Sequence, residues 1–126
     1  MAGDHLEQRA FAGAIVDRAA QQLRDLIKRL VGEIDEFPPF PGSMFTHGIE
    51  VPPPAHSNLG CVIVGEDGEL YELQLGLDDE AVAQGGDAVA ARIEHTVPLE
   101  LAPAEFIAYA HGAVQALVAH LDGNED

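Results

Sequence analysis

The stretch CVIVGEDGELYELQL at residues 61–75 decides the fold that the sequence predicts. It begins with a continuous apolar run at 61–64, and the GEDG sequence that follows has the composition of a tight turn. Apolar and polar residues then alternate, which places Tyr71, Leu73 and Leu75 on one side of a strand. Two strand-like runs joined by a glycine-containing turn predict a β-hairpin.

A further strand is predicted after this hairpin. Asp78 is a suitable cap for a short helix through Gln84, which the pair Gly85-Gly86 would end. Residues 89–101 then alternate well enough to form a strand, in which Pro98 is compatible with a sheet edge or a bulge. The alternation predicts a buried face formed by Ile93, His95, Val97, Leu99 and Leu101.

Amphipathic helices are predicted at both ends of the chain. Steps of three and four residues indicate the first helix, whose apolar stripe comprises Val16, Ala20, Leu23, Ile27, Leu30, Val31 and Ile34. Residues 1–15 fall off this stripe, and we expect them to form a flexible arm or a separate helical turn. A second stripe after Pro103 predicts the last helix, and residues 122–126 are expected to be a disordered tail.

These elements predict a single α+β domain over residues 1–126. The expected order is α-β-β-(α)-β-α, with a small antiparallel sheet of three or four strands and both terminal helices packed on one face. A sheet of this size has unpaired edges, and self-association is the simplest way to protect them. We therefore expect a homodimer.

The charge of the chain is strongly negative and unevenly distributed. The 22 acidic and 6 basic residues give a net charge of −16. Residues 1–34 hold five bases and five acids and are neutral, so residues 35–126 carry the whole excess. An acidic surface disfavours nucleic acid and anionic membranes as partners. We expect the neutral, arginine-bearing helix to pack on the acidic body, within the chain or across a dimer.

The cysteine content and the start of the chain bear on its location. Cys61 is the only cysteine, which excludes an intrachain disulfide. The first residues lack the basic segment of a signal peptide, and no apolar run approaches the roughly 20 residues of a membrane span. We expect a cytoplasmic protein.

Residues 37–58, FPPFPGSMFTHGIEVPPPAHSN, form the least regular part of the chain. They hold six of the eight prolines and three of the five phenylalanines, and a short edge strand at 46–51 is the most regular element that fits. Long irregular loops are often functional. The aromatic side chains of Phe37, Phe40 and Phe45 are therefore candidates for docking on a partner, or alternatively for completing the core.

A ligand pocket between the sheet and the helices, gated by this loop, is the alternative use of the segment. Its candidate lining residues are His47 and His56 of the loop, Cys61 of the hairpin and His95 of the later strand. One hypothesis is that a histidine serves as the base for a nucleophile such as Cys61, and another is that the group binds a metal. The simpler interpretation is two loop histidines, an inert core thiol and a hydrogen-bonded histidine at the rim of the core. No nucleotide-binding, zinc-protease or hydrolase motif is present, and no cofactor is predicted.

The sequence therefore favours a non-catalytic acidic protein-interaction or regulatory module that forms homo-oligomers, with a protein partner expected at the loop 37–58 or at the N-terminal helix. The alternative is a small-molecule or metal-binding protein, with enzymatic activity left open, whose pocket is gated by residues 37–58. A third hypothesis, an assembly chaperone, is supported by composition alone.

Overall fold

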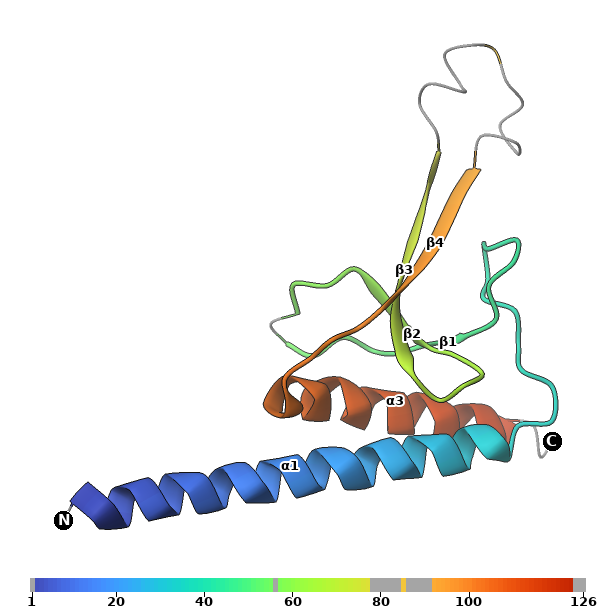
Figure 1. The fold of residues 1–126 in the computed structure, drawn as a ribbon. Helices are drawn as coiled ribbons and strands as arrows, with labels where there is room; N and C mark the ends of the chain where they lie inside the picture. The colour runs from blue at the N-terminus through green and yellow to red at the C-terminus, as the bar shows by residue number, and fades with distance from the viewer. Residues whose placement is uncertain (1, 56, 78–84, 86–91, 124–126) are drawn as a thin grey trace.

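The computed structural model describes residues 2–55, 57–77, 85 and 92–123. Two long helices lie side by side below an antiparallel sheet (Figure 1). The elements are α1 (Ala2–Gly32), β1 (Ile49–Glu50), β2 (Cys61–Val64), β3 (Leu70–Leu77), β4 (Arg92–Pro98) and α3 (Pro103–Gly123). The predicted α+β class is confirmed, with the observed order α-β-β-β-β-α.

The predicted hairpin is formed by β2 and β3. Its register pairs Cys61 with Leu73, and the backbone N–H of Gly65 donates to the carbonyl of Glu69 at 2.9 Å to close the turn. Gly68 has a φ of +78°, and a Cβ atom there would lie 2.8 Å from Cγ of Lys28. Glycine is thus required both by the backbone conformation and by the close approach of this turn to α1.

The four strands follow their order in the chain, β1-β2-β3-β4, and every neighbouring pair is antiparallel. Strand β1 lies within the predicted edge strand 46–51, and β4 lies within the predicted strand 89–101 at the other edge. The predicted helix 78–84 and the start of the predicted strand, 89–91, fall outside the described residues.

Both helices cover the same face of the sheet, and they run parallel to each other (Figure 1). The core between the two helices and the sheet consists of Ala20, Ile27, Val31, Val51, Val62, Val64, Leu70, Phe106, Tyr109, Ala110, Ala113 and Leu117. A Cβ atom on Gly112 would lie 2.8 Å from the carbonyl oxygen of Pro52, so the chain after β1 passes directly against α3. The two apolar stripes predicted from the sequence therefore face this common core.

The opposite face of the sheet is covered near β2 by residues 37–48. The backbone of this segment forms a small hairpin of its own, with a bridge between Pro39 and His47 and a hydrogen bond of 2.9 Å from the N–H of Phe40 to the carbonyl of Thr46. Ile63, whose side chain points to this face, is 1% exposed. The predicted irregular loop thus forms a partial second cover for the sheet.

The face of β4 that the alternation predicted to be buried is largely exposed. Ile93 and Val97 are 37% and 43% exposed, and His95 is also exposed. The register places them on the helix side of the sheet, as predicted. The hairpin of β3 and β4, however, rises beyond the helices (Figure 1), so only its base meets them. There Leu99 and Leu101 pack against the core.

The ends of the helices also differ from the prediction. Helix α1 is continuous from Ala2 to Gly32, so residues 2–15 belong to the same helix as the core stripe and do not form a separate turn. Helix α3 continues through Asp122 and Gly123, two residues expected in the disordered tail, whereas 124–126 lie outside the described residues. Residues 2–15 hold four alanines, whose high helix propensity favours continuing the helix where the apolar stripe has ended.

Candidate functional site

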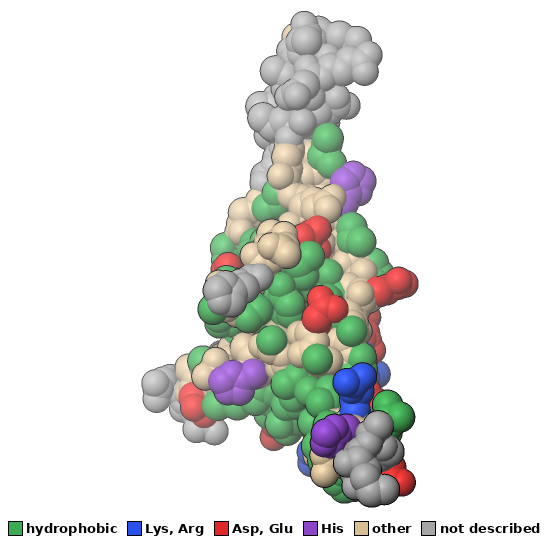
Figure 2. Space-filling view, turned by 90° about the vertical axis from the view of Figure 1, so that its left-hand side faces the viewer, with side chains coloured by type: hydrophobic (Ala, Val, Ile, Leu, Met, Phe, Trp, Pro, Cys, Tyr) green, Lys and Arg blue, Asp and Glu red, His purple; other side chains and the backbone are tan. Residues whose placement is uncertain are grey.

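The N-terminal part of α1 extends well beyond the start of α3 (Figure 1). Residues 5–15, which we call the α1 arm, are all exposed. Leu6, Phe11 and Ile15 within it are 63%, 71% and 56% exposed. Figure 2, viewed from the side on which α1 begins, shows hydrophobic side chains interrupted by isolated acidic ones over the body above the helices. The exposure of Leu6, Phe11 and Ile15 shows that the described residues leave the apolar side chains of the α1 arm uncovered.

A second apolar stripe runs along α1, outside the core. We call it the outer stripe, and it consists of the apolar residues Phe11, Ala12, Ile15, Ala19 and Leu26 together with Gln22. At about 100° per residue, Ile15 is rotated by about 120° around the helix from Ile27, which faces the core. The C-terminal end of this stripe borders a surface hollow lined by Ala19, Gln22, Leu23, Asp25, Leu26 and Arg29, all from α1. The same helix face thus carries protruding apolar side chains at one end and a hollow at the other.

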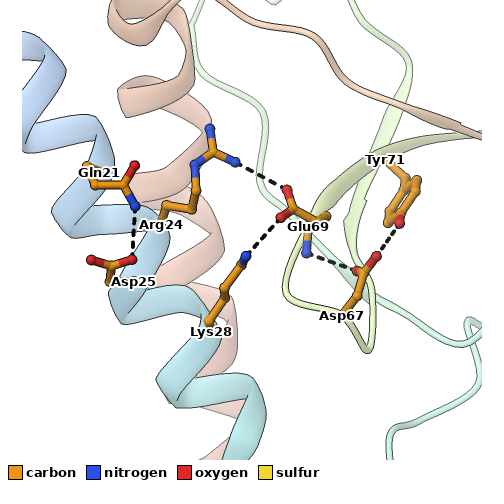
Figure 3. A network of polar contacts seen from close by, with 7 residues as sticks. All are labelled: Gln21, Arg24, Asp25, Lys28, Asp67, Glu69 and Tyr71. Carbon is orange, nitrogen blue, oxygen red and sulfur yellow. Dashed lines mark hydrogen bonds and ion pairs between the residues drawn. The ribbon is translucent and has the colours of Figure 1, made fainter.

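The C-terminal half of α1 is fixed to the turn between β2 and β3 (Figure 3). The carboxylate of Glu69 accepts a hydrogen bond from Nη1 of Arg24 at 3.2 Å and lies 3.1 Å from Nζ of Lys28. The guanidinium of Arg24 also stacks 4.4 Å from the ring centre of Phe106 on α3. Exposed ion pairs contribute little individually, but here they join three elements at one point. Arg9, Arg18 and Arg29 have no such contacts among the described residues.

The loop over the other sheet face is held by Glu94 of β4. Its carboxylate accepts hydrogen bonds from the backbone N–H groups of Met44 at 3.0 Å, Phe45 at 3.2 Å and Thr46 at 2.9 Å, and from the hydroxyl of Thr46. The Thr46 hydroxyl first, and then the backbone donors, lower the pKa of Glu94. These donors are satisfied within the chain, so the loop is docked on β4.

Between this loop and the sheet lies a cleft of about 360 Å³. It is lined by Phe45, Thr46, His47, Ile63, Gly65, Glu66, Asp67, Tyr71 and Thr96. The hydroxyl of Tyr71 donates to Asp67, and this hydrogen bond, with a smaller effect of burial, raises the pKa of Tyr71 to about 12. Tyr71 therefore stays protonated at neutral pH and acts as a hydrogen-bond donor rather than as a base.

The three phenylalanines of the predicted site are placed differently. Phe37 packs against the core, as in the core-completing interpretation. Phe40 borders a hollow that it shares with His120. Phe45 is 78% exposed at the rim of the cleft and keeps the partner-docking interpretation open.

The four predicted pocket residues are not all brought to one place. His47 lines the cleft, whereas neither Cys61 nor His95 is among its lining residues, and His56 lies outside the described residues. Burial, and then the charge of Glu50, raise the pKa of the Cys61 thiol, which makes it less reactive. Within the described residues, no group of three or more His, Cys, Asp or Glu side chains is arranged to hold a metal ion.

Sequence reasoning did not propose the outer stripe, Glu94 or Tyr109 as functional positions. The signal for the outer stripe was present, since Phe11 and Ile15 lie off the core stripe by a large angle. No local signal marks Glu94, because its partners are about 50 residues away in the sequence. The hydroxyls of Tyr109 and Ser57, 2.7 Å apart, likewise meet across distant segments.

Comparisons with protein-family models, with curated proteins and with solved structures found no match to this chain. In the described part of the chain, neither helix is long and apolar enough to cross a membrane.

Proposed function

We propose that this protein is a non-catalytic protein-interaction module that binds its partner through α1. The observation that carries the proposal is the exposure of Leu6, Phe11 and Ile15 on the α1 arm. Most helical stability in proteins comes from tertiary packing of an apolar face, so a partner that packs on the exposed arm would stabilise it. Burial of each large apolar side chain contributes about 1.5 to 3 kcal/mol.

Charge supports a protein as the partner. With a net charge of −16, the chain would repel nucleic-acid phosphate and anionic lipid, whereas residues 1–34 are neutral and tolerate a protein surface of either sign. The single cysteine fits the reducing conditions of the cytoplasm, where we expect the protein to act.

The proposal is tested by placing a photo-crosslinking amino acid at position 11 in living cells. Gln115, exposed on α3, provides the matched control position. We expect adducts of defined mass from position 11 and none from position 115. If position 11 gives no adduct in cells or in concentrated purified protein, while circular dichroism shows a folded chain, the proposal is wrong.

A second candidate function, binding of a small molecule, is favoured by an apolar pocket of about 390 Å³. Its lining comprises Pro54, Ala55, Ser57, Asn58, Leu59, Leu101, Glu105, Ala108 and Tyr109. The paired hydroxyls of Ser57 and Tyr109 supply the few polar groups that such pockets use for orientation.

Native mass spectrometry of gently purified protein tests this second function. A bound molecule should appear as a mass increment, and the Ala108→Trp variant, which fills the pocket, should lack it. A spectrum without any increment, or an increment that persists in Ala108→Trp, counts against the pocket.

A further inference from the structure

We infer that the partner of α1 is a second copy of this chain, with the two α1 helices packed antiparallel along their outer stripes. The inference rests on the proposed function and goes beyond it by naming the occupant and its orientation. Three features carry it: the charge of α1, the spacing of the outer stripe, and the hollow at one end of that stripe.

Charge makes α1 the surface on which two copies can meet. Every copy carries −16 outside residues 1–34, so contacts between two acidic bodies are repulsive. Residues 1–34 are neutral and hold five of the six bases, which removes this repulsion along α1. A strongly basic partner, by contrast, would be drawn to the acidic body rather than to α1.

The outer stripe has the spacing of a short helix-pairing seam. Ala12, Ile15, Ala19, Gln22 and Leu26 follow one another at steps of three and four residues, and Phe11 lies beside Ala12. This alternation keeps one helix face against a second helix. The seam covers little more than two heptads and includes a glutamine, so the pairing should be weak and concentration-dependent.

The hollow sets the direction of packing. When the helices run antiparallel and cross near residues 18 and 19, Phe11 of each copy lies level with Leu26 of the other and projects into the hollow bordered by Ala19 and Leu26. Each α1 arm then lies along the half of the other helix that Glu69 fixes to the body. A parallel pair would instead place the two Phe11 side chains together and leave both hollows empty.

Charges along α1 favour the same direction. Residues 1–19 hold three acids and two bases, and residues 20–34 hold two acids and three bases, so antiparallel packing sets opposite net charges side by side. Glu7 and Arg29, which lie on the same flank of the outer stripe, come level with each other across the pair. One contact opposes pairing, because Arg18 of one copy lies near the crossing and faces Arg18 of the other copy.

Sedimentation equilibrium of the purified chain over a range of concentrations measures the pairing. We expect a monomer–dimer equilibrium whose dissociation constant rises at least tenfold in Phe11→Glu. The matched control is Phe45→Glu, because Phe45 is 78% exposed, close to the 71% of Phe11, but lies on the opposite side of the sheet. An equal loss of dimer in both variants would overturn the inference, as would a wild-type chain that stays monomeric at all concentrations.

A charge exchange tests the register. Glu7→Arg and Arg29→Glu should each weaken the dimer, and the double variant should restore it to within about threefold of the wild type. Arg18→Ala should strengthen the dimer. If the loss of dimerisation free energy in the double variant equals the sum of the losses in the two single variants, Glu7 and Arg29 do not meet and the register is wrong.

Orientation is tested with single cysteines and a short bismaleimide in a Cys61→Ser background. Ala19→Cys lies near the crossing and should crosslink two copies. Phe11→Cys should not, because its two copies lie about 22 Å apart along the antiparallel pair. Crosslinking of Phe11→Cys would show a parallel pair and overturn the orientation.

Failure of this inference can be told apart from failure of the proposed function. If the purified chain is monomeric but position 11 crosslinks to a different protein in cells, the second copy is not the partner and the interaction module stands. If position 11 crosslinks to nothing, both are wrong.

Discussion

The two halves of α1 belong to one continuous helix and have opposite surroundings. The C-terminal half buries Ala20, Ile27 and Val31 against the sheet and α3, and two of its bases pair with Glu69. The N-terminal half exposes Leu6, Phe11 and Ile15, and every side chain of residues 5–15 is exposed. Similar residue types therefore stabilise the fold in one half and remain uncovered in the other.

This difference separates two reasons for which a helix forms. Tertiary burial holds the C-terminal half, whereas the α1 arm depends on the high helix propensity of its alanines and on continuity with the half that is packed. Apolar side chains that contribute nothing to the monomer are available for an interface. The following predictions test this contrast, beginning with the largest expected change.

Two isoleucines provide the sharpest comparison. Ile27 is 1% exposed and Ile15 is 56% exposed. Ile27→Ala should lower the free energy of unfolding by about 2 to 5 kcal/mol, because it leaves a cavity in the core. Ile15→Ala should change it by less than about 0.5 kcal/mol in dilute protein. Urea denaturation measures both, and equal losses would mean that the α1 arm is packed in the monomer.

The turn that fixes the C-terminal half should be sensitive at Gly68. Gly68→Ala is expected to cost about 1 to 3 kcal/mol, because it places a side chain at a positive φ and against Lys28. Gly76→Ala is the control, since Gly76 has open space around it and no positive φ. Similar denaturation midpoints for the two variants would show that the turn does not press on α1.

The α1 arm should respond to a change of helix propensity without a change in the core. Gly13 lies in the arm with nothing near the position of a Cβ atom. Gly13→Ala should stabilise the arm locally by about 0.5 to 1 kcal/mol. Hydrogen exchange should slow for the amides of residues 5–15 while the global unfolding free energy stays nearly constant. If the global free energy of unfolding rises by the same amount, the two halves of α1 unfold together.

The smallest effect on stability is expected from pH. The hydrogen bond to Asp67 raises the pKa of Tyr71 to about 12, so the folded chain holds this proton more tightly than the unfolded chain. The resulting stabilisation is present below about pH 10, the ordinary pKa of tyrosine, and is lost as pH rises through about 12.

Absorbance of tyrosinate in a Tyr109→Phe background follows Tyr71 alone, because the chain has two tyrosines. Asp67→Asn should move the observed pKa of Tyr71 back toward about 10. If Tyr71 already titrates near pH 10 in the Tyr109→Phe protein with Asp67 intact, Tyr71 and Asp67 are not hydrogen-bonded.

The parts of the fold that sequence predicted are those with local signals. The hairpin of β2 and β3 was predicted because GEDG joins two strand-like runs, and both core stripes follow helical spacing. The face of His95 was assigned correctly, but its burial was not. Alternation gives the side to which a residue points, whereas burial depends on how far the helices below extend.

The candidate site was less predictable, because its contacts join distant segments. Residues 37–58 were singled out, and the structure places Phe45 and His47 from this segment at one cleft. The docking of this loop on Glu94 has no counterpart in the local sequence. For α1, the angle of Phe11 and Ile15 was visible, but continuity of the helix was needed to make them one surface with Leu26.

The position of α1 and α3 at opposite ends of the element order in the chain has a consequence during synthesis. The core needs Ile27 from α1 and Leu117 from α3, so it cannot close until α3 has left the ribosome. At 5 to 20 residues per second, the 70 residues between Gly32 and Pro103 take roughly 4 to 14 seconds to make. Throughout that interval the apolar side chains of α1 that later enter the core lack their final partners. Where two ribosomes translate the same messenger RNA, the α1 helices of the two nascent chains are then free to meet each other before either core closes.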